Sequence, residues 1–205
     1  MNRSSRLFGL LLLAAAGPAL AKLEHFKISP VHTRVAFQVS HDGFSNPIAS
    51  FSQTSGDLDF DPDDVAGARV DVRIPIATLE LGDKDWQGKI LDPTFFDAKK
   101  FPEARFVSTK VSKTGDKSYA IEGTLTLHGV SHPLTLQATF NALKRHPLTL
   151  RHTIGFSATG TLKRSDFGMA AWKNLVGDDV HLMIEVEAEK SGSATTSEAS
   201  DGDEK

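Results

Sequence analysis

Apolar and polar residues alternate along most of this chain, with a period of two. Residues 70–76, VDVRIPI, show the pattern most clearly, because valine and isoleucine occupy every second position with polar residues or proline between them. A period of two is typical of a β-strand with one apolar face, and roughly eight strands are predicted in this way. The predicted strands include residues 35–39, 58–60, 70–76, 106–111, 125–127, 134–140, 154–158 and 180–186.

The alternation also constrains the fold class. Strands of a parallel sheet buried on both faces are apolar throughout, so strands with one polar face favour an antiparallel sandwich or barrel. Closure into a barrel has the further advantage of removing exposed strand edges. The sequence therefore predicts an all-β protein, and the alternation leaves sandwich and barrel open.

One segment, residues 82–102, interrupts the strand pattern. Asp83 or Asp85 is expected to cap a short helix that places Trp86 and Ile90 on one side. The segment carries more aromatic surface than a solvated loop needs, so we expect it to pack over one end of the strands. It is interpreted either as a plug for the core or as a lid over a ligand mouth. Its aromatic residues are Trp86, Phe95, Phe96 and Phe101.

The first residues are typical of an export signal. Arg3 and Arg6 precede an apolar stretch over residues 7–21, which ends in the small-x-small sequence Ala19-Leu20-Ala21. The stretch is shorter than the roughly 18 to 20 apolar residues that span a bilayer, and no later segment comes closer. We therefore expect residues 1–21 to be a signal peptide cleaved after Ala21, and the mature protein to be periplasmic, without a transmembrane segment.

The remaining chain divides into one domain and a tail. Residues 22–190 are expected to form a single domain with its own core. Residues 191–205, SGSATTSEASDGDEK, have no large apolar side chain and are predicted to be a disordered acidic tail. The formal net charge of the whole chain is −3, and the domain itself is close to neutral. This balance gives no electrostatic reason to expect nucleic acid as a partner.

The chain has no cysteine, which excludes a disulfide framework and a lipoprotein anchor. His128 and His132 have the spacing of zinc ligands on a helix, but Gly129 and Pro133 indicate that HGVSHP is a short connection between strands. No other histidine has ligand spacing. We therefore predict polar histidines at a turn and a strand end, and no metal.

The short stretches that come nearest to known catalytic motifs do not match them. The stretch GFSATG lacks the second glycine of a nucleophile elbow, and DFG in RSDFGM has no phosphate-binding loop beside it. The acidic run DLDFDPDD lacks the ligand series of a calcium loop, and its aspartates are expected to face solvent opposite Leu58 and Phe60. The many carboxylates single out no acid/base pair. No catalytic residue is predicted.

A series of longer motifs carries a family resemblance. In chain order they are SPVHTRVAFQVSH, SGDLDFDP, FFDAKKFPEARFVSTKV, IEGTLTLHGVSHPLTL, GFSATGTLKRSDFGM and VGDDVHLMIEVEAE. With these motifs the chain resembles the YceI-like polyisoprenoid-binding family from residue 26 to about residue 188. The resemblance implies an extended antiparallel eight-stranded lipocalin-like β-barrel, exported in many bacteria, that holds an isoprenoid or similar amphiphilic chain. Lys89 stands where many members carry a histidine, so a role tied to that histidine does not transfer.

If the barrel holds a lipid, the inward apolar positions are expected to line its chain. Two cations are then candidates for contact with the polar head group of the lipid. Arg164 and Lys89 are the two candidates, although Arg164 pairing with Asp166 as part of a structural turn is an equal alternative. The predicted apolar lining consists of Phe37, Val39, Val72, Ile74, Phe95, Phe96, Phe106, Leu125, Leu127, Leu136, Phe140 and Phe156.

Together these observations predict an exported binding protein, not an enzyme, that sequesters or carries a polyisoprenoid, an isoprenoid quinone or a similar amphiphilic lipid. No cofactor is expected other than such a bound lipid, and a homodimer is left open. The first alternative is an accessory protein or enzyme of isoprenoid-quinone or redox metabolism. The second is a ligand-free interaction module, whose interior would be packed solid with Phe and Leu.

Overall fold

The computed structural model describes residues 23–191, so the predicted signal peptide and nearly all of the predicted tail lie outside the described residues. The described part contains eleven strands, one α-helix and two short 3-10 helices. The strands are β1 (Glu24–Ile28), β2 (Arg34–His41), β3 (Ile48–Phe51), β4 (Ser55–Phe60), β5 (Arg69–Pro75), β6 (Leu79–Glu80), β7 (Glu103–Lys113), β8 (Ser118–Leu127), β9 (Val130–Arg145), β10 (His152–Lys163) and β11 (Val176–Lys190). The helices are α1 (Lys84–Leu91), η1 (Ile76–Thr78) and η2 (Arg164–Phe167).

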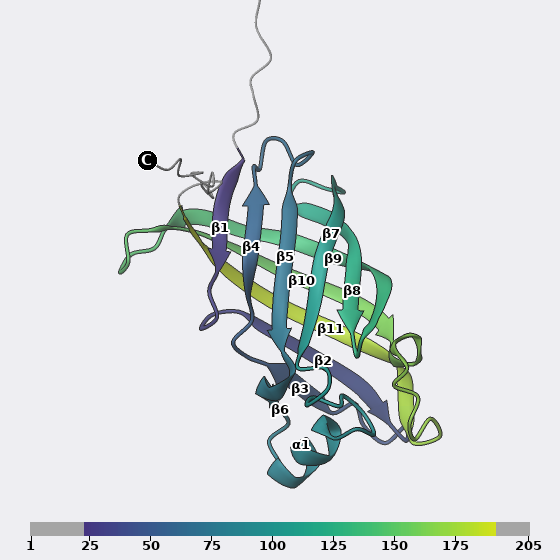
Figure 1. Cartoon of the computed structure of the whole chain (residues 1–205). Coiled ribbons are helices and arrows are strands. Elements are labelled where there is room, and N and C mark those ends of the chain that lie inside the picture. Colours follow the sequence, from purple (N-terminus) through teal and green to yellow (C-terminus); the bar gives the residue numbers. More distant parts are fainter. Residues whose placement is uncertain (1–22, 192–205) are drawn as a thin grey trace, which may run out of the picture.

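Eight strands close into an antiparallel barrel, in the order β1-β4-β5-β7-β8-β9-β10-β11, with β11 pairing back to β1 (Figure 1). The eight-stranded antiparallel barrel implied by the family resemblance is confirmed, and the sandwich is excluded. Closure leaves the barrel strands without a free edge along the seam between Ala188 and Ile28, which are direct partners.

One edge of the long strand β11 pairs with two different strands. Its end pairs with β1, whereas residues 180–185 pair with residues 34–39 of β2. Strand β2 continues into β3, and β3 pairs with β6, so a three-strand extension projects from the barrel. The eight predicted strands and the eight barrel strands therefore differ by one, because β2 lies in the extension and β1, which the alternation did not predict, completes the barrel.

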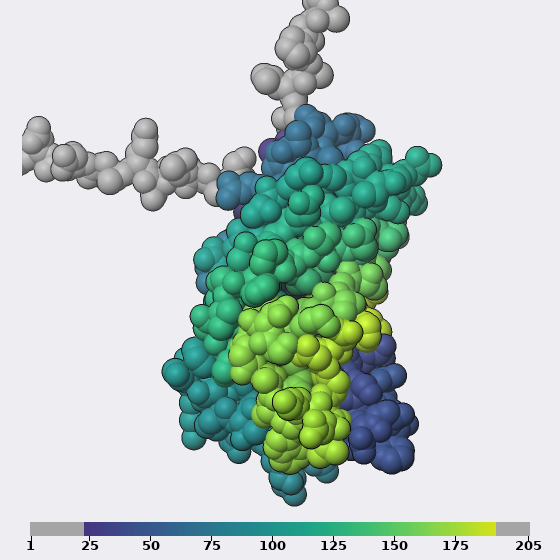
Figure 2. All heavy atoms as spheres, turned by 90° about the vertical axis from the view of Figure 1, so that its right-hand side faces the viewer, coloured from purple at the N-terminus to yellow at the C-terminus, as the bar shows by residue number. Residues whose placement is uncertain are grey.

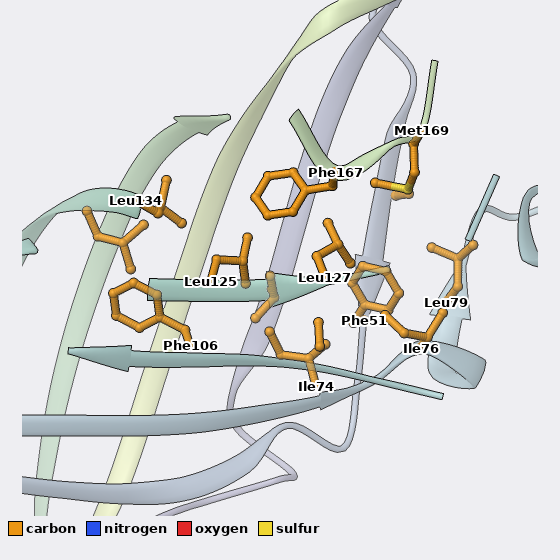
Figure 3. Packing of buried hydrophobic residues seen from close by; sticks show 14 residues of the cluster. Phe51, Ile74, Ile76, Leu79, Phe106, Leu125, Leu127, Leu134, Phe167 and Met169 are labelled. Atoms are coloured by element: carbon orange, nitrogen blue, oxygen red, sulfur yellow. The ribbon is translucent and has the colours of Figure 1, made fainter. Parts of the chain in front are cut away.

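Inward side chains form two buried clusters, one at each end of the barrel. The cluster at the end of the barrel near α1 contains Phe51, Phe106 and Leu125. Figure 3 shows its side chains converging from several strands, together with Phe167 of η2 and the nearby Met169. The other cluster contains Phe26, Phe60 and Ile154. Inside positions alternate with outside ones as predicted: Leu58 and Phe60 are buried, while Asp57 and Asp59 contact His25 on the outer face.

The predicted short helix is present as α1. Asp83, the N-cap, accepts a hydrogen bond from the backbone N–H of Trp86 at 2.8 Å, which confirms one of the two predicted caps. The helix buries no residue completely, and it covers the lower end of the barrel in Figure 1.

The connection that carries the two histidines is shorter than predicted. His128 and Gly129 alone form the turn, both with positive φ (52° and 76°), and β9 begins at Val130. Positive φ at both central residues is the geometry of a tight type I′ hairpin turn, in which glycine is favoured. The prediction that HGVSHP is a connection is therefore correct for the first residues of the segment and wrong for the later ones, because His132 and Pro133 lie inside β9. The strand tolerates Pro133 because β10 pairs with β9 only from Gln137 onward.

Candidate functional site

A cavity of about 410 Å³ lies inside the barrel and is lined by residues of both buried clusters. Four residues pack against both clusters but keep part of their surface accessible, because they border this empty space. They are Val70, Val72, Ile121 and Ile184. The volume lies within the roughly 300–1,000 Å³ that is usual for ligand pockets. A barrel packed solid with Phe and Leu is therefore excluded, and with it the feature expected of a ligand-free module.

Aromatic side chains close one end of the cavity. The ring of Phe60 lies 5.6 Å from that of Tyr119 and 5.2 Å from that of Phe156, both in edge-to-face geometry. Phe140 stacks on Phe60 at 6.2 Å. Because Phe60 and Tyr119 are each 3% exposed, this end offers no route to solvent through the cluster.

The opposite end is a mouth formed by three segments that contact one another in a ring. The rings of His41 and Trp86 lie 6.4 Å apart, and this contact joins β2 to α1. The rings of Phe95 and Trp172 lie 6.0 Å apart, and this contact joins the residues after α1 to the loop before β11. The backbone N–H of Asp42 donates to the carbonyl of Leu175 at 2.6 Å and completes the ring. Trp86 and Trp172 border the cavity and are 37% and 61% exposed, so the cavity opens to solvent at the α1 end.

The structure brings eleven of the twelve predicted lining residues together around the cavity. Phe140 differs, since it packs against Phe60 and Phe156 in the aromatic cluster and does not border the cavity. The eleven are Phe37, Val39, Val72, Ile74, Phe95, Phe96, Phe106, Leu125, Leu127, Leu136 and Phe156.

Arg164, one predicted head-group residue, borders the cavity but is only 6% exposed. Its guanidinium donates to the carbonyls of Gly177 (2.8 Å), Ala171 (2.7 Å), Val176 (2.9 Å) and Met169. Four of its five N–H donors are therefore engaged by backbone, and a single donor is left for a ligand.

No hydrogen bond joins Arg164 to Asp166 within the described part of the chain, and the carboxylate that acts on it electrostatically is Asp178. Burial lowers the pKa of Arg164. Burial also acts to raise the pKa of Asp178, but hydrogen bonds from the Ser165 hydroxyl and backbone N–H, together with the charges of Lys163 and Arg164, leave that pKa below its ordinary value. The arrangement fixes η2 and the loop over residues 169–175 against the start of β11.

Arg164→Lys is expected to loosen this loop. A lysine retains the charge but cannot reproduce the planar donor set, so several carbonyls lose their partner at a cost of about 2–4 kcal/mol in the free energy of unfolding. Hydrogen exchange should accelerate in residues 169–177 more than in β8. Lys163→Arg, at an exposed neighbouring position, serves as the control, and equal protection of the loop in Arg164→Lys and wild type would contradict the assigned role.

Lys89, the other head-group candidate, lies exposed on α1 and borders the cavity. Unlike Arg164, it makes no hydrogen bond or ion pair with any residue between 23 and 191, so its ammonium group is free to meet a ligand at the mouth. Asp92 and His41 border the same end.

Sequence reasoning missed Thr54 as a cavity residue. Its side chain is fully buried and borders the cavity, but its hydroxyl has no hydrogen-bond partner in the described structure. A buried hydroxyl without a partner is unfavourable unless a bound group completes it. Thr54 follows Gln53, whose φ is positive (55°), and lies outside any alternating segment, so no sequence pattern indicates that its side chain points inward.

The two histidines of the turn have structural partners. His128 Nδ1 lies 3.1 Å from the carbonyl of Phe167, and the rings of His132 and Phe167 are 5.8 Å apart. Among residues 23–191 no group of three or more His, Asp or Glu side chains is arranged to hold a metal ion. In the same range, no helix has the length and apolar character needed to cross a membrane.

These features define a class of protein: a closed antiparallel barrel with an apolar internal cavity that opens at one end, as in lipocalin-like folds. The profile of the YceI-like domain matches residues 26–188, and the chain belongs to this family.

Similar sequences and solved structures agree. A UPF0312 protein of Pseudomonas putida is 35% identical over 157 residues, which cover 77% of this chain and 81% of the relative. The YceI protein of Campylobacter jejuni has a TM-score of 0.67 and 32% identity, covering 73% of this chain and 88% of that structure. A domain of Saccharophagus degradans, described as polyisoprenoid binding and implicated in plant cell wall breakdown, shares the fold with a TM-score of 0.64 at 17% identity, covering 83% of this chain and 100% of that structure.

Proposed function

We propose that this protein is an exported, non-enzymatic carrier that holds one polyisoprenoid, isoprenoid quinone or similar amphiphilic lipid in the barrel. The observation that carries the proposal is the cavity itself, which is lined almost entirely by apolar side chains, closed by aromatic rings at one end and open at the other. Such a shape accommodates a slender apolar chain with its polar end at the mouth.

The energetics are consistent with binding by burial of the chain alone. Each buried CH₂ contributes roughly 0.8 kcal/mol, so about ten carbons provide about 8 kcal/mol, the order of a micromolar affinity before association costs. A longer prenyl chain has correspondingly more to gain. The description of the Saccharophagus degradans domain as polyisoprenoid binding supports this ligand class.

The polar end of the ligand is assigned to the mouth. Lys89 offers an ammonium there that is paired with no residue between 23 and 191, whereas most donors of Arg164 are engaged by backbone. A phosphorylated or carbonyl-bearing head group would find its nearest cation in Lys89. Export to the periplasm follows from the signal pattern of residues 1–21 and completes the proposal.

Titration with geraniol, farnesol and geranylgeraniol, prenyl alcohols of increasing length, tests the ligand class. We expect affinity to rise by about tenfold or more from the shortest to the longest, because each isoprene unit buries further apolar surface. Straight-chain alcohols of equal carbon number serve as the control for shape. Absence of binding across the prenyl series would overturn the proposal.

A further inference from the structure

Large apolar side chains surround the mouth of the cavity and face solvent. We call this set the rim: Phe44 (85% exposed), Ile48 (61%), Trp86 (37%), Trp172 (61%) and Leu175 (46%). They come from three segments: the turn after β2 together with the first residue of β3, helix α1, and the loop before β11. Figures 1 and 2 place these segments at the same end of the molecule. Apolar side chains gathered in this way at the entrance of a pocket indicate an interaction surface.

The rim is held in place by the contacts that shape the mouth. The ring contact between Trp172 and Phe95, and the hydrogen bond from Asp42 to Leu175, tie its segments together. Trp172 has a positive φ of 53°, which is an uncommon and costly conformation for a bulky residue. Its carbonyl accepts hydrogen bonds from Leu175 and Val176, both at 2.9 Å, which hold the indole in this exposed position.

The chemistry of the rim fits one surface in particular. Both tryptophans of the protein lie in it, and tryptophan favours the interface between lipid head groups and acyl chains. The three rim segments, residues 40–48, 83–96 and 170–176, carry four aspartates and three lysines, so their net charge is close to zero. A nearly neutral apolar edge is suited to an uncharged or zwitterionic lipid surface rather than to an anionic one.

The rim is also continuous with the cavity. Trp86 and Trp172 border the cavity and are part of the rim, so an apolar surface runs without interruption from the outside into the barrel. We propose that the rim docks on the surface of a zwitterionic lipid bilayer and places the mouth where a lipid chain enters or leaves. This inference rests on the proposed function, since docking would let the lipid carried in the barrel pass between the bilayer and the cavity.

The two tryptophans allow docking to be measured directly. Mature protein is mixed with phosphatidylcholine vesicles that contain no prenyl lipid, and tryptophan emission is recorded with and without brominated acyl chains. We expect a blue shift, quenching by the bromines and co-sedimentation with the vesicles. Addition of phosphatidylserine should change the partition coefficient less than about threefold, because the rim is nearly neutral.

Matched variants distinguish docking through the rim from nonspecific binding of exposed apolar residues to vesicles. The double substitution Phe44→Ser and Leu175→Ser removes two rim residues that do not border the cavity, and it should lower vesicle partition by about tenfold or more. The control is Leu148→Ser with Leu150→Ser, which removes equally exposed apolar residues (87% and 62%) from the hairpin between β9 and β10. The control should bind vesicles as wild type does.

Two results would overturn docking: wild type that does not bind the vesicles, or equal loss of binding in both double variants. The same proteins titrated with farnesol in buffer give an independent readout. The rim variant should retain wild-type affinity for farnesol while its vesicle binding falls. Wild type that binds farnesol but not the vesicles would refute docking and leave the carrier function intact. Failure of wild type to bind farnesol refutes the carrier function instead.

Discussion

Phe156→Asp is expected to abolish folding or to lower the melting temperature by about 10 °C or more. Phe156 is 8% exposed and its ring contacts those of Phe60 (5.2 Å) and Phe140 (5.6 Å) at the closed end of the barrel. A carboxylate in this aromatic cluster has no cation beside it, so its burial costs several kcal/mol out of a usual stability of about 5–15 kcal/mol. Thermal unfolding followed by circular dichroism measures the effect.

Thr159→Asp is the matched control, because it places the same charge on the same strand. Thr159 lies three residues further along β10 with the opposite parity, and its side chain is exposed. The control should melt within a few degrees of wild type. Equal sensitivity at the two positions would contradict the assignment of the inner and outer faces of β10.

Ile184→Trp is expected to remove lipid binding while the barrel still folds. Ile184 packs against both clusters from the middle of the barrel and borders the cavity, so an indole at this position fills the space a ligand chain would occupy. We expect affinity for a long prenyl alcohol to fall by about a hundredfold or more. The melting temperature should change by only a few degrees, because the added side chain enters an existing void rather than a packed region.

Met183→Trp provides the comparison for this variant. Met183 is the preceding residue of β11, points outward and is 37% exposed. The same indole on the outer face should leave prenyl-alcohol binding unchanged. If Ile184→Trp bound the ligand as well as Met183→Trp does, the barrel interior would not be the binding site.

The strand content was predictable because alternation reports directly on a one-faced sheet. Strand β1 was missed for a physical reason: Glu24–Ile28 offers only two inward apolar residues, Phe26 and Ile28, which is too short a pattern to distinguish from a loop. Strands β3 and β6 are shorter still, with four and two residues. Closure between β1 and β11 joins the two ends of the described chain, which no local pattern specifies.

The lining residues were predictable for the same reason, since parity and resemblance together indicate which side chains face inward. The existence of a cavity was not, because it depends on whether facing side chains meet across the barrel. Phe140 shows the limit: its parity is right, but its neighbours Phe60 and Phe156 lie close enough to enclose it. The environment of Arg164 was equally hidden, because its partners are backbone carbonyls, two in the irregular loop after η2 and two at the start of β11, and no side-chain pattern marks them.

Native mass spectrometry of the purified protein, followed by organic extraction, tests whether the barrel carries a lipid. We expect a mass above that of the polypeptide by one lipid, and the extract should contain a polyisoprenoid, an isoprenoid quinone or a related amphiphile. A mass equal to that of the polypeptide, unchanged after incubation with prenyl lipids, would contradict the claim that the barrel is a lipid carrier.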